Sequence, residues 1–195
     1  MRKVFLFLVL ITTTANAQLI KFGEAKGLFM SIGVGPRFPI AVASESQNIG
    51  VGFNVSISYT DNNFLPVFFY STFSYNHFPG KQNFYKVTDY SSFSTNSIIF
   101  SPGVRYYFSP VINEGVLLMP IADFGFSLAL YEKLHQFKIG TGKQNFVEEV
   151  GYTGFHIGGG FSMFILDVIT YYNFIPNNQF ISFDLKIRIP IYVTI

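Results

Sequence analysis

Apolar and polar residues alternate almost without interruption along the last stretch of the chain, from Phe180 to Val193. Successive side chains of an extended strand point to opposite faces, so residues two apart share a face. One face of this segment is apolar and consists of Ile181, Phe183, Leu185, Ile187, Ile189, Ile191 and Val193. The other face carries Ser182, Asp184, Lys186, Arg188 and Tyr192. Such a pattern is typical of a strand that separates lipid from the lumen of a closed barrel.

The same alternation predicts seven further strands. They are expected at residues 28–40, 49–60, 65–77, 97–108, 116–131, 149–165 and 168–175. The inner faces of 65–77 and 168–175 stay ambiguous, because aromatic or apolar residues occupy both of their faces. Long polar loops are expected at 41–48, 78–96 and 132–148, and short turns at 61–64, 109–115 and 166–167. Long outer loops and short periplasmic turns are typical of outer-membrane barrels, and only the short connection at 176–179 departs from this order.

The composition favours a membrane protein without helical spans. Charged residues make up 12% of the chain, against about 25% in soluble domains, and aromatic residues make up 19%. Beyond the N-terminal region, no segment offers the roughly 20 continuous apolar residues of a transmembrane helix. Only helices and closed barrels satisfy their own backbone groups in lipid. The sequence therefore predicts an all-β, eight-stranded antiparallel up-and-down transmembrane β-barrel over residues 28–195.

A soluble up-and-down barrel such as a lipocalin is the alternative fold, because it also alternates polar and apolar residues. Its apolar residues would face inward and its polar residues would face water. Here the polar faces consist mainly of glycine, serine, asparagine and threonine, with few charges. These small residues suit a narrow interior better than a water-exposed coat, so the membrane barrel is favoured.

The N-terminus has the features of a secretory signal peptide. Arg2 and Lys3 precede an apolar run at 4–11 and the small-residue site at 15–17. We predict a signal peptide at 1–17, cleavage before Gln18, and a short periplasmic segment at 18–27, followed by the barrel in the outer membrane. The chain has no cysteine, which excludes a lipoprotein anchor, disulfides and thiolate chemistry. Loss of Arg2 and Lys3 would leave 11 basic and 11 acidic residues, so the charge does not suggest a nucleic-acid partner.

Two short motifs resemble a known family. The first is Pro-Gly-Val-Arg-Tyr-Tyr-Phe at 102–108, and the second is the glycine-rich segment at 158–161. With the signal peptide and the length, they resemble the bacterial outer membrane protein β-barrel domain family, the small porin-like barrels of the OmpA and OmpX type. The resemblance implies a barrel in contact with outer-membrane lipid and lipopolysaccharide, which the barrel assembly machinery inserts during biogenesis.

Charged residues on the polar faces are candidates for a cluster in the lumen. Exposing Lys186 or Arg188 to lipid would cost roughly 2–4 kcal/mol each near the midplane, so we expect both to face inward, toward acids such as Asp184 or Asp123. The expected cluster comprises Arg37, Arg105, Asp123, His156, Asp184, Lys186 and Arg188. An eight-stranded barrel is only wide enough for its own side chains. A hydrogen-bonded plug is therefore favoured over an ion pathway.

A pentapeptide occurs twice, in two expected outer loops. Gly-Lys-Gln-Asn-Phe at 80–84 recurs at 142–146. One interpretation is a paired surface site for an unknown ligand, formed by Lys81, Phe84, Lys143 and Phe146. The other interpretation is similar turn chemistry, in which glycine supplies backbone freedom and polar residues supply solvation.

The three histidines give no catalytic or metal-binding motif. His77 lies near the outer rim but has no nucleophile motif around it, His135 is expected to be a solvated loop residue, and His156 an interior hydrogen-bonding residue. No cofactor is expected. We predict a non-enzymatic barrel with a plugged lumen and a structural or surface-interaction role through its outer loops. The alternatives are a lipid-modifying enzyme with His77 at its rim, or a narrow channel.

Overall fold

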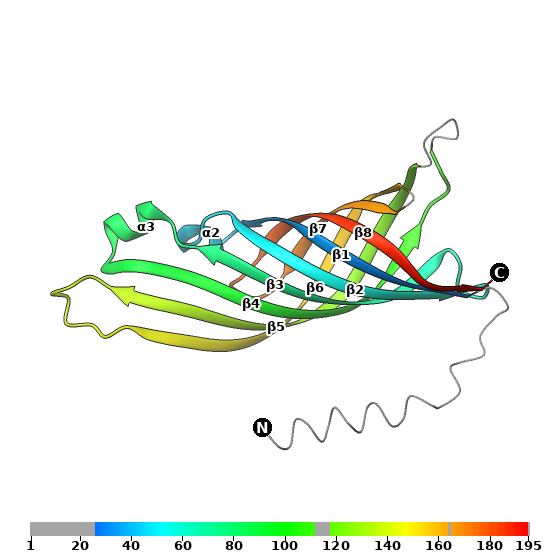
Figure 1. Cartoon of the computed structure of the whole chain (residues 1–195). Helices are drawn as coiled ribbons and strands as arrows, with labels where there is room; N and C mark the ends of the chain where they lie inside the picture. The colour runs from blue at the N-terminus through cyan, green and yellow to red at the C-terminus, as the bar shows by residue number, and fades with distance from the viewer. Residues whose placement is uncertain (1–25, 112–117, 164, 195) are drawn as a thin grey trace, which may run out of the picture.

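The computed structural model describes residues 26–111, 118–163 and 165–194. These residues form eight strands, which close into one antiparallel barrel in chain order (Figure 1). The strands are β1 (Lys26–Pro39), β2 (Gly50–Asp61), β3 (Val67–Pro79), β4 (Tyr90–Tyr107), β5 (Leu118–Phe137), β6 (Phe146–Met163), β7 (Leu166–Phe174) and β8 (Phe180–Thr194). The predicted fold class is confirmed. The expected signal peptide at 1–17 lies outside the described residues.

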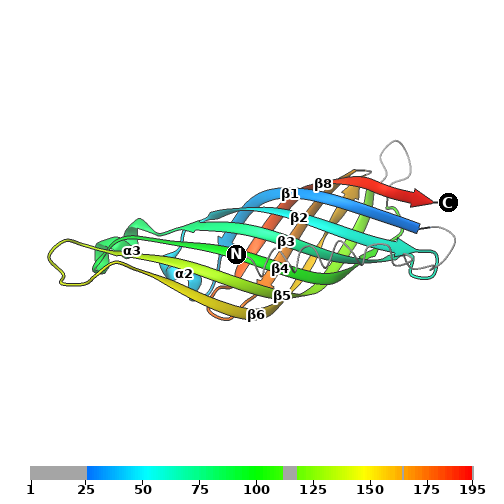
Figure 2. The same ribbon diagram turned by 60° about the horizontal axis from the view of Figure 1, so that its bottom comes forward.

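Two short helices lie in the connections at one end of the barrel, which we call the loop end. They are α2 (Ala43–Ser46), between β1 and β2, and α3 (Gln82–Val87), between β3 and β4. Within the described ranges, no helix has the length and apolar character needed to cross a bilayer. The opposite end, which we call the turn end, holds the start of β1 and the end of β8 (Figures 1 and 2).

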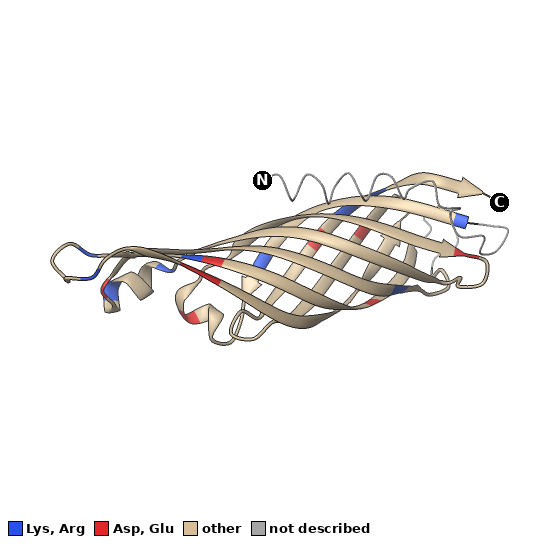
Figure 3. Ribbon diagram, turned by 90° about the horizontal axis from the view of Figure 1, so that it is seen from below, with Lys and Arg blue, Asp and Glu red and all other residues tan. Residues whose placement is uncertain are grey.

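Side chains alternate strictly between the lumen and the outer surface. On β5, Asp123 and Ser127 are buried, while Phe126 is 64% exposed on the outer face. On β8, Asp184 and Lys186 are likewise buried and Ile187 is exposed. Figure 3 shows charged positions on the barrel strands as well as at the loop end, and those named above on the strands are buried. The result is an apolar outer belt around a polar lumen.

The two segments of ambiguous facing acquire a definite orientation. On β3, Tyr70 and Thr72 face the lumen, while Phe73 is exposed on the outer face. On β7, Ile169 and Tyr171 face the lumen. Hydrophobicity alone could not assign these faces, because tyrosine and isoleucine also fill the interior.

The predicted turn at 166–167 is wrong. Leu166 and Asp167 are the first residues of β7 and pair with β6, where Asp167 lies opposite Ser162. Asp167 is fully buried in the lumen. Asp167, Ile169 and Tyr171 therefore alternate on one face of a strand that begins two residues earlier than expected.

About half of each of two predicted loops is strand. β4 begins at Tyr90, β5 reaches Phe137 and β6 begins at Phe146, so much of 78–96 and 132–148 is paired. These segments are polar because they continue β4, β5 and β6 past the rim of the barrel (Figures 1 and 2). We call this three-stranded projection, residues 90–96, 132–137 and 146–151, the extension. A sheet without lipid on its outer face does not need the apolar alternation that marks the barrel strands.

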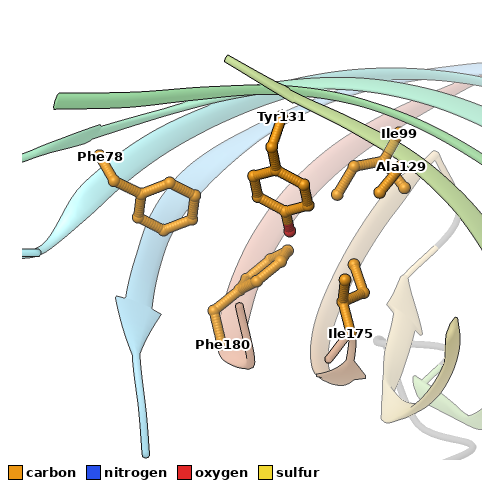
Figure 4. Packing of buried hydrophobic residues seen from close by; sticks show 6 residues of the cluster. All are labelled: Phe78, Ile99, Ala129, Tyr131, Ile175 and Phe180. Carbon is orange, nitrogen blue, oxygen red and sulfur yellow. The ribbon is translucent and has the colours of Figure 1, made fainter. Parts of the chain in front are cut away.

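Apolar side chains close the lumen toward the loop end. Phe78 and Phe180 meet there with ring centroids 5.5 Å apart, and Tyr131 lies beside them (Figure 4). This apolar layer consists of Phe78, Ile99, Ala129, Tyr131, Ile175 and Phe180. A second apolar cluster, Tyr107, Ile121, Ile169 and Tyr171, lies among the charged side chains toward the turn end.

Candidate functional site

The structure places all the predicted cluster residues on the inner face of the barrel. Arg105 forms the centre of one network. Its Nε and NH2 donate to the two carboxylate oxygens of Asp123 at 2.8 and 2.9 Å, which is the bidentate geometry of a strong charge-assisted pair. Its NH1 donates to Asp167 at 3.0 Å, and Tyr171 Oη donates to Asp123 at 2.7 Å.

Asp167 is a lumen residue that the sequence analysis missed. It lies 3.0 Å from Arg105 and 4.0 Å from Arg188, so it joins two cations from different strands. Arg188 also donates to Tyr107 Oη and, at 3.0 Å, to Ser162 Oγ. Acids such as Asp184 or Asp123 were expected near Arg188, and Asp167 lies 4.0 Å from it. Asp167 was missed because 166–167 was expected to be a turn and the facing of the following strand was ambiguous.

A second ion pair lies nearer the loop end. Arg37 NH1 is 2.7 Å from Asp184 Oδ1, and Arg37 Nε donates to Asn76 Oδ1 at 2.7 Å. Gly52 makes room for this guanidinium, because a Cβ there would lie 2.3 Å from Arg37 Nε. The side chains of Arg37 and Asp184 are 2% and 4% exposed, so the pair is held inside the lumen.

Lys186 faces inward as expected, but its expected acids are not its partners. Its Nζ donates to Tyr171 Oη at 3.1 Å and lies 4.9 Å from the centre of that ring. Among the described residues, no carboxylate oxygen lies within 4.0 Å of it. Asp184 and Asp123 are instead engaged by Arg37 and Arg105.

His156 completes the interior network. Its Nε2 is 2.7 Å from Tyr70 Oη, and its Nδ1 is 3.1 Å from Ser127 Oγ. Ser127 in turn contacts Ser101 Oγ at 3.2 Å. The ring therefore joins β3, β5 and β6 as a hydrogen-bonding residue, with no acid in contact with it.

His77 lies at the rim, on the outer face of β3. Its Nδ1 is 2.8 Å from Asn96 Oδ1, and Asn96 Nδ2 donates to Glu132 at 3.1 Å. Within the described part of the chain, no carboxylate or hydroxyl group is hydrogen-bonded to His77. The acid, base and hydroxyl that a hydrolase would need are not assembled around this imidazole.

His135 is not a solvated loop residue. It lies on the inner face of β5 in the extension and is 7% exposed. Its Nδ1 is 3.0 Å from Tyr90 Oη, and its Nε2 is 3.1 Å from Glu148. The ring stacks on Phe146 with centroids 4.3 Å apart and 6° between the planes. Cross-strand packing of aromatic residues therefore buries a histidine in a segment that the composition marked as loop.

The two copies of the pentapeptide adopt different backbone structures. In the first copy, Gln82 begins α3, and Lys81 Nζ donates to the carbonyl of Ser44. In the second copy, Gly142 has a positive φ of 71°, and the chain then enters β6. Lys143 Nζ is 2.7 Å from Asp89, and this hydrogen bond lowers the pKa of the Asp89 carboxyl.

The phenylalanines of the two copies meet in one aromatic cluster on the extension. Phe84 stacks on Tyr90 at 5.1 Å, Tyr90 stacks on Phe137 at 4.7 Å, and Phe137 lies 6.2 Å from Phe146. We call this set the aromatic cluster; it consists of Phe84, Tyr90, Phe93, His135, Phe137 and Phe146. Phe146 is still 49% exposed, so the cluster has a surface open to solvent.

The described residues contain no group of three or more histidine, aspartate or glutamate side chains arranged to hold a metal ion. The charged groups of the lumen instead pair with one another or with hydroxyl groups. This geometry suits a structural plug.

Several solved structures are similar to this chain. Neisserial surface protein A matches with a TM-score of 0.54 and 17% identity, over 85% of this chain and 97% of that one. Ail of Yersinia pestis gives 0.47 and 12% identity, over 86% and 100%. The outer membrane enzyme PagL gives 0.45 and 16% identity, over 84% and 99%. No family model and no curated protein sequence matches the chain.

The fold is therefore that of the small eight-stranded outer-membrane β-barrels, as the resemblance to the OmpA and OmpX type implied. At these low identities the similarity shows the fold and no more.

Proposed function

We propose that this protein is exported through a cleavable signal peptide, spans the outer membrane as a plugged barrel, and binds a partner at the cell surface through the extension. Outer-membrane lipid and lipopolysaccharide surround its apolar belt, and the barrel assembly machinery inserts it. The observation that carries this proposal is the extension itself, three strands that project past the rim with an exposed aromatic cluster.

The edge of β6 supports a binding role. β6 pairs with β7 only between Phe155 and Met163, whereas its pairing with β5 continues to Phe146. Residues 146–154 therefore have a strand neighbour on one side only. An unpaired edge is a template for an added strand, and neighbouring side chains then provide selectivity.

The lumen supports a role without turnover or transport. Its charged side chains are engaged in ion pairs and hydrogen bonds, and the apolar layer of Phe78, Tyr131 and Phe180 lies above them. His77 contacts an amide, and His135 is enclosed by aromatic rings. Neither histidine has the exposed nucleophile and base that an enzyme at the rim would need.

Site-specific photocrosslinking in intact cells tests this proposal. A photoreactive amino acid at Val147, which is 52% exposed on the extension, should crosslink to a protein. The same group at Phe126, in the apolar belt, should crosslink to lipid alone. Replacing Lys81, Phe84, Lys143 and Phe146 by alanine should abolish the protein adduct and leave barrel assembly intact.

A variant of α3 serves as the matched control. Lys86→Ala with Val87→Ala changes the same helix outside the aromatic cluster, and Val87 is 83% exposed. It should retain the adduct. Lipid adducts alone at Val147, or an adduct that survives the fourfold replacement, would contradict a binding role for the extension.

A further inference from the structure

Among the residues that the structure describes, the lumen holds one more cation than carboxylate. Below the apolar layer, the described inward-facing ionisable residues other than His156 are four basic and three acidic side chains. They are Arg37, Arg105, Lys186 and Arg188, and Asp123, Asp167 and Asp184. A buried charge without a counterion is unfavourable, so a further negative charge would stabilise an interior of this kind.

Lys186 is the cation without a carboxylate. Each of the three acids is within ion-pair distance of an arginine, whereas Lys186 contacts Tyr171 Oη as its hydrogen-bond acceptor. An ammonium group has three N–H donors, so two remain without an acceptor from the described residues. The residue is 2% exposed, so bulk water does not solvate them.

A cavity of about 40 Å³ lies beside this ammonium group. That volume is room for about three water-sized species. Its walls are rich in cations and hydrogen-bonding groups: Lys186, Arg37, Asn54, Tyr171 and Ser182. Asn54 is 1% exposed and its Oδ1 has no hydrogen-bond partner, so this amide is available to the cavity contents. Phe180 and Ile99 of the apolar layer also line the cavity.

We propose that this cavity binds a small monovalent anion, chloride under physiological conditions, on Lys186 Nζ. The anion accepts hydrogen bonds from the ammonium group and supplies the missing negative charge, which water alone does not. A half-turn of the Asn54 amide brings its NH2 group into the cavity as a further donor. Asp184 also lines the cavity, and its Oδ1 has no hydrogen-bond partner, but Arg37 NH1 lies 2.7 Å from that oxygen and neutralises its charge.

Bromide provides a direct test, because it replaces chloride and scatters anomalously. Crystals of the full barrel, refolded and grown in sodium bromide, should show an anomalous peak within hydrogen-bond distance of Lys186 Nζ. Lys186→Met should lose the peak and still assemble, since it removes the unpaired charge. Lys133→Met, in the extension, should keep it.

Thermal unfolding gives an independent readout. The midpoint temperature of unfolding of the unsubstituted barrel should rise with chloride or bromide concentration. It should not change when gluconate is added to the same ionic strength, because only the small anion fits the cavity. Lys186→Met should lose this difference. A cavity holding water only, a peak that persists in Lys186→Met, or equal effects of gluconate and chloride would overturn the proposal. If Lys186→Met fails to assemble, the bromide map of the unsubstituted barrel and the gluconate comparison decide.

Discussion

The guanidinium of Arg105 holds two carboxylates from different strands, one bidentately. Its partners Asp123 and Asp167 lie on β5 and β7, so the network ties opposite parts of the wall together. The sequence predicted that Arg105 and Asp123 share the lumen. It could not predict the pairing of Arg105 with Asp167 or of Asp123 with Tyr171. Aromatic or apolar residues occupy both faces of β7, so hydrophobicity did not show which face lies inward.

Removing one member of this network should cost more than removing an exposed pair. We expect Asp123→Ala to lower the free energy of unfolding by about 3–5 kcal/mol, because it removes one of the two carboxylates that pair with a buried arginine. Lys133→Ala, which breaks the partly exposed pair with Glu148, should cost at most about 1 kcal/mol. Urea unfolding in lipid vesicles measures both, followed by circular dichroism since the chain has no tryptophan. Equal effects of the two substitutions would refute the buried network.

The contact between Lys143 and Asp89 predicts a pH dependence at the tip of the extension. The hydrogen bond from Lys143, and then its charge, lower the pKa of Asp89, so the folded state favours the carboxylate. The contact therefore stabilises the tip above the ordinary pKa of an aspartate, and its contribution disappears as the pH falls through the lowered value. Carboxyl-carbon NMR should show this low pKa. Lys143→Ala should raise it toward the ordinary range, while Lys86→Ala should leave it unchanged.

At the scale of elements, the sequence predicted strands where lipid imposes alternation and missed them where it does not. β1, β2 and β8 lie within a few residues of their expected positions, because each has one apolar and one polar face. The extension lies past the rim, where lipid does not impose an apolar outer face, so its polar residues indicated loops. The strands of the extension are joined by cross-strand contacts such as Lys133 with Glu148 and His135 with Phe146. These contacts link two different segments, so the residue pattern of one segment does not reveal them.

The aromatic cluster should determine the local stability of the extension. We expect Phe146→Ala to accelerate amide hydrogen exchange at 132–137 and 146–151, because it removes the ring stacked on His135. Val147→Ala changes the opposite face of the same strand and should have little effect. Exchange within the barrel at 121–129 should not change in either variant. Rapid exchange of the extension before any substitution would mean that the cluster does not hold it.

At the scale of the whole molecule, closure from the loop end depends on the apolar layer, and this can be tested by thiol labelling. The chain has no native cysteine, so Ser182→Cys introduces one reporter in the cavity beneath Phe180. Ser182 is 4% exposed, so a membrane-impermeant methanethiosulfonate added from outside should label it slowly. In a background with Phe78→Ala and Phe180→Ala, labelling should accelerate many-fold, because two of the large rings of the layer are gone.

Val147→Cys on the extension should react rapidly in both backgrounds. Ser182→Cys reacting as fast as Val147→Cys with both rings present would show an open lumen. Planar bilayers should show no steady conductance even without the two rings, because the network around Arg105 still fills the barrel below the cavity.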